Sequence, residues 1–561
     1  MMRRPCLVFA LLAVLVLPGP SMVAALGGSE ERVDLDMVTR LRAEEFQRSE
    51  VRRLLHELTD VLGPRLTGSP GGLAASEWTR QELARFGLVN AHLEPFPFGR
   101  GWSYSQASLR MLTPREVPLL TVPEAWTPGT SGVLRGALVK VRVETEKDFD
   151  TYKGKLAGKV VLLEEVRDPR LPERTVEGPE VKRYTEETLH DLGRYEAPTL
   201  RLDFRARGQR RVRFRKALGA FLAAEKALAT ISASSYDQGI FGVQARGNWE
   251  KDGGSDGIPG VVVTTDTYGM LSRLVADGKN VEIEVEVAAR FHAEGDHSNN
   301  TIAEIPGTDK KGEIVMAGAH LDSWHSGTGA TDNASGCVVV LEAARLLKAL
   351  GVKPKRTIRI ALWTGEEQGL LGSYYYVKDH FASRPETTDP AQKAFPEPNR
   401  DDTWPLQLKP EHAKLAAYFN IDNGSGKIRG VYAQGNAAVR PIFEAWLEPF
   451  HDLGATTVTL RDTRGTDHLS YDRVGLPGFQ FIQDELDYNS RTHHTNLDDY
   501  EHARPEDLEQ AAIILASFLY DAAMRPEPLP RKPLPTAPPV EEKKKDGVEE
   551  GGRERARESG R

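Results

Sequence analysis

Histidine and carboxylate side chains follow four apolar, strand-like runs in the second half of the 561-residue chain. A His-x-Asp pair or an adjacent Glu pair is common on ordinary protein surfaces, and each taken alone indicates little. Four such groups in the same position relative to a strand indicate a single functional site. The groups are His320, Asp322 and Asp332 after the first run, Glu366 and Glu367 after the second, Asp422 after the third, and His493 and His494 in a loop beyond the last.

These residue types favour zinc chemistry. Imidazole and carboxylate groups suit borderline divalent ions, and the chain lacks the set of cysteines that a structural zinc site would use. Two zinc ions about 3.5–4 Å apart, joined by one bridging carboxylate, activate water and stabilise a developing oxyanion. Three carboxylates and two histidines could hold such a pair, namely Asp332, Glu367, Asp422, His320 and His494.

Two acidic groups would remain for other work at this site. Asp322 is well placed to accept a hydrogen bond from the second ring nitrogen of His320, which would fix the tautomer of that histidine. Of the adjacent glutamates Glu366 and Glu367, one can bind metal while the other faces the water. The free glutamate would act as general base and then pass the proton to a leaving amine.

Strands interleaved with helices must position these groups. Apolar runs predict strands at 313–319, 357–363, 415–421 and 478–482, and a mostly apolar stretch predicts a helix at 333–350. This alternation is typical of an α/β fold with a mostly parallel, twisted sheet and helices on both faces. Open sheets of this kind bind ligands beyond the carboxyl ends of their strands.

The rest of the chain divides into regions that differ in the pattern of their residues. Residues 34–62 and 73–87 show helical spacing, whereas short β-branched runs predict a strand-rich insertion at 120–280. We therefore expect a catalytic domain in two parts, 30–119 and 281–525. Residues 526–561 are rich in proline and then in charge, which predicts a disordered tail.

The amino terminus predicts export. Arg3 and Arg4 precede an apolar run that is too short to span a bilayer, and small residues follow it, so we expect a signal peptide at 1–25. The protein would then be secreted or periplasmic, with no membrane segment in the mature form. A formal charge of −8 without a basic stripe argues against a nucleic-acid partner.

The chain resembles the co-catalytic di-zinc exopeptidases, the family of bacterial leucyl aminopeptidases and plasma glutamate carboxypeptidase, and more distantly of glutamate carboxypeptidase II and the transferrin receptor. The resemblance covers most of residues 34–523. It implies the hydrolase-like fold of these zinc exopeptidases, and a protease-associated domain for the insertion. The motifs that carry it are LTDVLGPRLTGSPGG, GAHLDSW, GATDNASG, TGEEQGLLGS, NIDNG, GTDHLSYDRVGLPGF and HHTNLDDY.

This resemblance implies a role for each site residue. Glu366 would be the general base and Asp322 the partner of His320, and His468 and Tyr471 would line the substrate site. Relatives have a cis peptide bond after the bridging residue, here between Asp332 and Asn333. The implied ligands of two Zn²⁺ are His320, Asp332 as the bridge, Glu367, Asp422, and His494, which precedes a Thr-x-x-Asp sequence.

The predicted function is that of an exopeptidase that hydrolyses terminal bonds of peptides or dipeptides. Aminopeptidase activity is the first choice because one zinc edge can bind a free α-amine. A carboxypeptidase or dipeptidase is the alternative. A glutaminyl cyclase, which uses a single zinc, and a receptor-like binding protein that has lost its ligands fit less well, because the full ligand set is present. The sequence leaves a homodimer open.

Overall fold

The computed structural model describes residues 31–165, 181–194, 204–251, 254–292 and 296–538. The predicted signal peptide at 1–25 lies outside these ranges, and the account below concerns the compact unit Val33–Arg561. No helix within the described ranges has both the length and the apolar character needed to cross a membrane.

The first sheet carries the strands that precede the candidate site. Its four central strands are parallel to one another, and antiparallel partners flank them on both sides, so the sheet is mixed rather than nearly all parallel. All four strands predicted here are present. In spatial order the sheet consists of β1 (Val89–Pro97), β10 (His297–Ile305), β12 (Arg356–Trp363), β11 (Lys310–His320), β15 (Leu415–Asn420), β18 (Gly478–Gln483), β16 (Ile428–Tyr432) and β17 (Thr457–Thr459).

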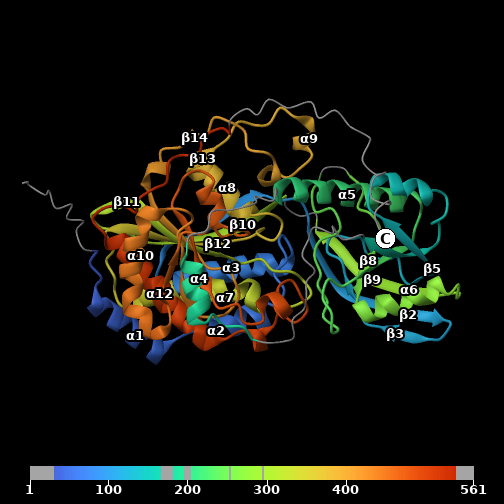
Figure 1. Ribbon diagram of the computed structural model, residues 1–561, viewed down its shortest axis with the longest axis horizontal. Helices are drawn as coiled ribbons and strands as arrows, with labels where there is room; N and C mark the ends of the chain where they lie inside the picture. The colour runs from blue at the N-terminus through green and yellow to red at the C-terminus, as the bar shows by residue number, and fades with distance from the viewer. Residues whose placement is uncertain (1–30, 166–180, 195–203, 252–253, 293–295, 539–561) are drawn as a thin grey trace, which may run out of the picture. The chain divides into compact units, whose positions relative to one another are not determined.

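Helices cover both faces of this sheet, as predicted, and Figure 1 shows α8 on one side of β10 and β12 with α3, α7 and α12 on the other. The larger core lies on the side of the sheet that α7 and α12 cover. It contains most of the apolar side chains that point to that face from alternate positions of the strands. The helices of the unit are α1 (Leu35–Arg48), α2 (Val51–His56), α3 (Pro70–Arg85), α4 (Glu186–Gly193), α5 (Phe204–Ala224), α6 (Thr265–Ala276), α7 (Ser335–Ala349), α8 (Leu371–His380), α9 (Pro390–Lys393), α10 (Arg440–Leu447), α11 (His468–Asp472) and α12 (Pro505–Met524).

Strand alternation determines which side chains leave the core at the carboxyl ends. Along β11, Val315, Ala317 and Ala319 enter the larger core, whereas Met316 enters the smaller core on the other face. His320 has the parity of Met316, because successive side chains of a strand point to opposite faces. The last residue of β11 therefore turns away from the larger core, on the face covered by α8.

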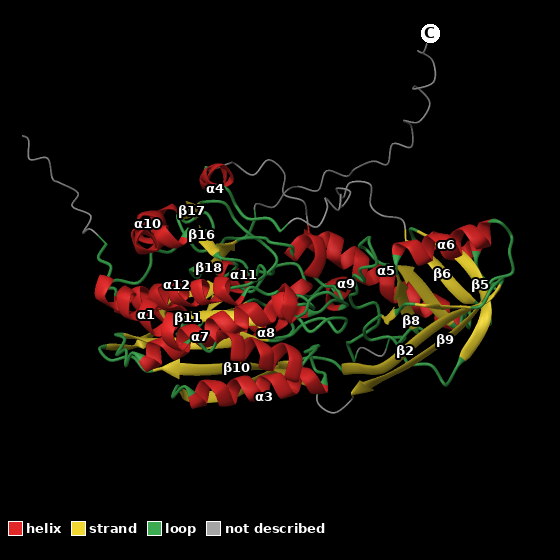
Figure 2. Cartoon of the chain, turned by 90° about the horizontal axis from the view of Figure 1, so that it is seen from below, coloured by secondary structure: helices red, strands yellow, loops and turns green. Residues whose placement is uncertain are grey.

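A second sheet occupies much of the predicted insertion, but it is wider than the range 120–280, because β2 and β9 extend it at both ends. Figure 2 shows α5 and α6 with this sheet, and separate apolar clusters pack under the two helices. Its spatial order is β3 (Val117–Leu119), β2 (Gly101–Thr113), β9 (Glu282–His292), β5 (Leu134–Val143), β6 (Val160–Glu165), β7 (Ala229–Ala233), β8 (Gly260–Val263) and β4 (Val122–Pro123). A separate strand pair joins β13 (Ala382–Ser383) to β14 (Gln407–Leu408).

The prediction of a disordered tail is wrong for residues 526–538. Arg531 donates to the carbonyl oxygens of His412 (2.9 Å) and Leu415 (2.6 Å). Lys532 pairs with Asp472 at 2.5 Å, and Leu529 is buried in the larger core. The composition of this segment gave too little apolar area to order it, but side-chain cations that reach backbone carbonyls and a carboxylate supply the missing contacts. Residues 539–561 lie outside the described ranges.

Candidate metal centre

The structure brings the five predicted metal ligands together beyond the carboxyl ends of the central strands. His320 ends β11, Glu367 follows β12, and Asp422 follows β15, while His494 lies in the loop after β18. Nε2 of His320 is 3.3 Å from Oδ1 of Asp422, and Nε2 of His494 is 2.9 Å from Oε2 of Glu367. Residues that are up to 174 positions apart thus form one cluster.

Asp332 joins the two halves of this cluster. Its Oδ1 atom is 3.2 Å from Nε2 of His320, and its Oδ2 atom is 3.3 Å from Nε2 of His494. The residue lies in the short turn Ala330–Ala334, and its peptide bond to Asn333 is cis, as the family resemblance implies. A carboxylate with one oxygen toward each histidine is the arrangement that a bridge between two cations requires.

Both histidines of the His493–His494 pair approach Asp332, but at different distances. Nε2 of His493 is 3.9 Å from Oδ2 of Asp332, compared with 3.3 Å for His494. Two groups of potential metal ligands share Asp332, one with His320 and Asp422 and the other with both of these histidines. Glu367 contacts His494, so the geometry favours His494 as the ligand.

Glu366 and Glu367, which follow β12, lie where burial disfavours their charged forms. Burial raises the pKa of Glu366 well above its ordinary value, and the charges of Asp422 and Glu367 add to this effect while His320 opposes it. Burial also raises the pKa of Glu367, with Asp332 as the next contributor. Cations placed among these carboxyl groups would reverse that trend.

Asp322 acts differently from its predicted role. Nδ1 of His320 is hydrogen-bonded to the backbone carbonyl of Asp322 at 2.9 Å, whereas the nearer carboxylate oxygen is 3.6 Å away. The carboxylate instead accepts bonds from the backbone N–H groups of Glu366 (3.2 Å) and Glu367 (3.3 Å) and from the hydroxyl of Thr67 (2.9 Å). Asp322 therefore holds the backbone that presents the two glutamates.

Arg65 supports the loops around the cluster, a role that could not be predicted from its place in a family motif. Its fully buried guanidinium donates to backbone carbonyl oxygens of Leu58 and Gly63 and of three residues that precede the Asp332 turn. The acceptors are Leu321 at 2.8 Å, Leu58 and Gly63 at 3.1 Å, Thr328 at 2.7 Å and Gly329 at 2.8 Å. The guanidinium group of Arg65 thus fixes both the segment after β11 and the residues that lead into the Asp332 turn.

Asp498 holds the Asp332 turn from the other side. Its carboxylate accepts the backbone N–H groups of Thr331 (2.6 Å) and Asp332 (3.1 Å) and the hydroxyl of Thr331 (2.7 Å). Burial and the charge of Asp332 raise the pKa of Asp498 to about 7. Asp498 is the aspartate of the Thr-x-x-Asp sequence that follows His494, so the same loop carries a candidate ligand and the support of the bridge.

The structure does not bring the two predicted substrate-contacting residues to the cluster surface. Tyr471 is fully buried in the smaller core, where its ring stacks on Tyr418 at 4.0 Å. His468 is also fully buried, with Nε2 2.8 Å from the side-chain amide of Gln434. Burial lowers the pKa of His468 to about 3. The α11 turn packs both side chains against the sheet, and their role in lining a substrate site remains a prediction.

A cavity of about 140 Å³ is lined in part by Gln368, the residue that follows Glu367 in the chain. The side-chain amide of Gln368 is buried and has no hydrogen-bond partner among the described residues. Helix α5 and the loop 245–258 supply most of the lining, which includes three cations and two anions. The charged lining residues are Arg215, Lys216, Arg246, Glu250 and Asp256.

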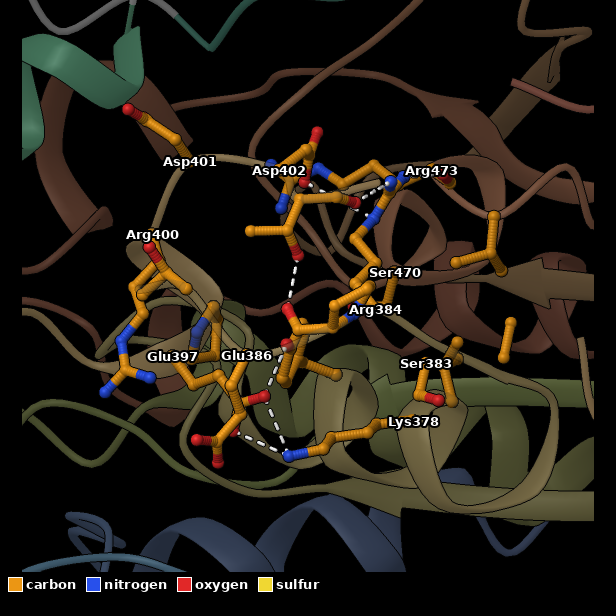
Figure 3. A pocket seen from close by; sticks show the side chains of 18 residues that line it. Lys378, Ser383, Arg384, Glu386, Glu397, Arg400, Asp401, Asp402, Ser470 and Arg473 are labelled. Atoms are coloured by element: carbon orange, nitrogen blue, oxygen red, sulfur yellow. Dashed lines mark hydrogen bonds and ion pairs between the residues drawn. The ribbon is translucent and has the colours of Figure 1, made fainter. Parts of the chain in front are cut away.

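A smaller cavity, of about 60 Å³, lies apart from this chemistry (Figure 3). It is lined by α8 and by residues 382–387 and 397–403, and none of the candidate ligands contributes to it. Figure 3 shows Lys378 reaching toward Glu397, and the two charges pair at 2.7 Å. The opposite charges along its wall neutralise one another, so this cavity does not compete with the metal centre as the candidate site.

The donor set fits metal ions. Oδ2 of Asp332 and Oε1 of Glu367 are buried, and neither has a hydrogen-bond donor within the part of the chain that the structure describes. Burying unsatisfied carboxylate oxygens is costly unless a cation or donor meets them. Two histidines and three carboxylates around these atoms suit zinc, whose ligands in proteins are nitrogen and oxygen as well as sulfur.

Residues 300–519, which contain all five candidate ligands, match the family model described as Peptidase family M28. This part of the chain is similar to peptidase family M28. Together with the α/β sheet and the histidine and carboxylate cluster beyond its strand ends, the similarity indicates a metallo-exopeptidase whose class of substrate is peptides.

Similar proteins extend this match beyond residues 300–519. Carboxypeptidase Q from Bos taurus is 29% identical over 475 residues, which cover 84% of this chain and 85% of that protein. The fold is similar to that of a peptidase M28 precursor from Shewanella amazonensis SB2B, with a TM-score of 0.62, 24% identity and coverage of 90% and 99% of the two chains. A zinc aminopeptidase from Bacillus subtilis gives a TM-score of 0.53 at 19% identity, with coverage of 85% and 95%.

Proposed function

We propose that this exopeptidase works with two zinc ions held by the five clustered residues. The observation that carries the proposal is Asp332, whose two carboxylate oxygens face the two histidines at 3.2 and 3.3 Å. His320 and Asp422 would complete the site of one ion, and Glu367 and His494 that of the other. The three carboxylates offset most of the charge of two divalent cations, and one hydroxide would neutralise the remainder.

The residues of the chain supply positioning and proton transfer. When bound, the zinc ions provide Lewis acidity and an activated water. Glu366 accepts a proton from that water and donates it to the nitrogen of the leaving amine. Asp322 supports this step, because it fixes the backbone N–H of Glu366 at 3.2 Å and so fixes where the carboxyl group points.

Removal of a residue from the amino end is the first candidate specificity. The centre is rich in buried acidic groups, and Asp322, Asp467 and Asp498 lie close enough to the candidate ligands to perturb pKa values there. A field of this sign favours a substrate end that carries an amine over one that carries a carboxylate. The structural similarity to a zinc aminopeptidase supports the same candidate.

Carboxypeptidase or dipeptidase action is the second candidate, and one specific feature favours it. The cavity beside Gln368 is lined by Arg215, Lys216 and Arg246, against two anions. We propose that a peptide carboxylate beyond the scissile bond lies toward this lining, where Lys216 pairs with Glu250 at 2.5 Å and Arg246 with Glu124 at 2.7 Å. Carboxypeptidase Q, which is similar over most of both chains, supports this candidate. A dipeptide would satisfy both candidates at once.

Hydrolysis of a defined panel tests these proposals. The purified protein would be given aminoacyl anilides, dipeptides, and tripeptides blocked at either end, before and after removal of metal with a chelator. We expect two zinc ions per chain and loss of hydrolysis on chelation that added zinc restores. Cleavage of carboxyl-blocked but not amino-blocked peptides supports the first candidate, and the reverse supports the second. Full activity in metal-free protein would contradict the two-zinc proposal.

The remaining proposals concern export and the second sheet. We propose that residues 1–25 direct the protein to a secreted or periplasmic location, on the strength of their charge and apolar pattern. The second sheet, with α5 and α6 on its two faces, is proposed to be a protease-associated domain. Sequencing of the amino terminus of exported protein tests the first of these, and a start near residue 26 is the expected result.

A further inference from the structure

A segment of the second-sheet module lies against the loop that carries His494. The segment comprises residues 236–244, between β7 and β8, and it pairs with residues 493–496 through backbone and side-chain bonds. Gly242 and Thr495 form an antiparallel bridge. The bonds are Val243 N–H to His494 O at 3.0 Å, Asn496 N–H to Phe241 O at 3.2 Å, Phe241 N–H to Asn496 Oδ1 at 2.7 Å, and Tyr236 O–H to His493 O at 2.8 Å.

Gln244, at the end of this segment, reaches the imidazole of His494. Its side-chain amide nitrogen is 2.7 Å from Nδ1 of His494, and its amide oxygen accepts a bond of 2.9 Å from Arg211 on α5. His494 has a φ angle of 62°, which lies in the left-handed region that residues other than glycine rarely adopt. Contacts from the module therefore meet both the backbone and the ring of this histidine.

We propose that Gln244 is a positioning residue of the metal centre. This inference rests on the proposed function, because it assumes that Nε2 of His494 binds an ion. A neutral imidazole that binds metal through Nε2 carries its hydrogen on Nδ1, and a partner at Nδ1 then fixes the ring orientation. The side-chain amide of Gln244 lies at hydrogen-bond distance from that atom.

The carboxamide can serve His494 in both states of the site. Without an ion, Arg211 donates to Gln244, Gln244 donates to Nδ1, and the hydrogen on Nε2 faces Oε2 of Glu367 at 2.9 Å. With an ion on Nε2, the hydrogen lies on Nδ1, and a half-turn of the carboxamide presents its oxygen as acceptor, at the cost of the bond that Arg211 donates to that oxygen. A side chain with both a donor and an acceptor allows this reversal without movement of the backbone.

The experiment compares zinc binding by purified full-length variants. Gln244→Leu keeps the size of the side chain and removes both polar atoms, whereas Gln244→Glu keeps an acceptor for Nδ1–H next to Arg211. Gln81→Leu, on the exposed face of α3, is the matched control. Zinc content per chain and the dissociation constant of each ion are measured by competition with a chromophoric chelator, and thermal unfolding is recorded for the metal-free proteins.

We expect Gln244→Leu to bind one of the two ions about 10–100-fold more weakly, the usual effect of removing a partner of a metal ligand. Gln244→Glu should bind both ions at least as tightly as the unmodified protein, and Gln81→Leu should not differ from it. Unchanged zinc affinity in Gln244→Leu overturns the inference, as does equal weakening in Gln244→Glu, which would indicate a purely steric role. If the unmodified protein binds no zinc, the proposed function itself fails.

Discussion

The indole N–H of Trp324 donates a hydrogen bond of 2.6 Å to Oε2 of Glu367. The same carboxylate oxygen is 2.9 Å from Nε2 of His494, and the ring of Trp324 meets the ring of His494 nearly edge to face, with centroids 5.9 Å apart. Trp324 is almost fully buried. Trp324 thus contacts both a candidate carboxylate ligand and a candidate histidine ligand and helps to fix their relative position.

Trp324→Phe should weaken zinc binding because it removes the donor to Glu367 while it keeps an aromatic ring in place. We expect roughly a tenfold loss of affinity for one ion, the low end of the effect seen when a partner of a metal ligand is removed. Chelator competition measures this loss. Trp404→Phe is a suitable control, because that ring stacks on Arg384 instead. Equal affinities in the two variants would contradict the assigned role.

Glu366→Gln should abolish turnover and leave zinc in place. The substitution keeps the shape of the side chain but removes its ability to accept a proton, so kcat should fall at least about a hundredfold, the low end of general-base contributions. Zinc content by atomic spectroscopy should remain that of the unmodified protein. Glu367→Gln is the informative comparison, since it should lose metal affinity as well as activity. Near-normal kcat in Glu366→Gln would reject the general-base role.

Arg65→Lys should destabilise the fold even though lysine keeps the positive charge. A lysine has a single nitrogen and cannot reach five backbone carbonyl oxygens in different directions, so several buried acceptors would lose their donor. We expect a loss of about 2–4 kcal/mol in the free energy of unfolding, measured in urea. Arg80→Lys, which affects an ion pair with Glu77 on α3, should change it by less than about 1 kcal/mol. Similar losses in the two variants would count against the role of Arg65.

A buried acidic pair between α1 and α7 should make stability depend on pH. Glu45 and Glu342 are both fully buried, and burial followed by the neighbouring Glu342 raises the pKa of Glu45 well above its ordinary value of 4.5. In the unfolded chain Glu45 loses its proton near that ordinary value, but in the folded protein it keeps the proton to higher pH. Its contribution to stability is therefore full below about pH 4.5 and declines as pH rises toward the folded pKa.

Glu45→Gln should remove much of that decline, because glutamine is neutral at every pH. We expect the variant to be more stable than the unmodified protein at pH 8, by about 1–3 kcal/mol, and to show little advantage near pH 4.5. Urea unfolding at both pH values measures the difference. The same substitution at the exposed Glu187 on α4 should have no such effect. A variant that loses stability at pH 8 would show that the charge of Glu45 is needed.

The sequence was sufficient for the parts of the site that depend on local order. His320, Glu367 and Asp422 each follow an apolar strand, and parallel strands must bring their carboxyl ends to one edge, so their proximity could be predicted. The structure also confirms the predicted strands at 313–319 and 415–421, because a short apolar run is a local pattern. The burial of Tyr471 could not be predicted, because a motif position does not reveal which face of a short helical turn meets solvent.

The supports of the site could not be predicted from spacing. Gln244 is 250 residues from His494, and no local pattern distinguishes it from any other polar residue in a loop. Arg65 is surrounded by turn-forming residues that predict exposure, whereas the fold places its guanidinium among backbone carbonyls. These contacts depend on how distant loops meet, which the spacing of residues along the chain does not encode.

The order of the candidate ligands along the chain has a consequence for biosynthesis. His320, Asp332, Glu367 and Asp422 all leave the ribosome before His494, and the support of the bridge, Asp498, emerges later still. A nascent polypeptide can therefore hold only an incomplete, solvent-open set of zinc donors until translation is nearly finished. Under the proposed two-zinc arrangement, the full ligand set exists only once residue 494 has been synthesised, and a product truncated before it would lack one ligand of the second ion.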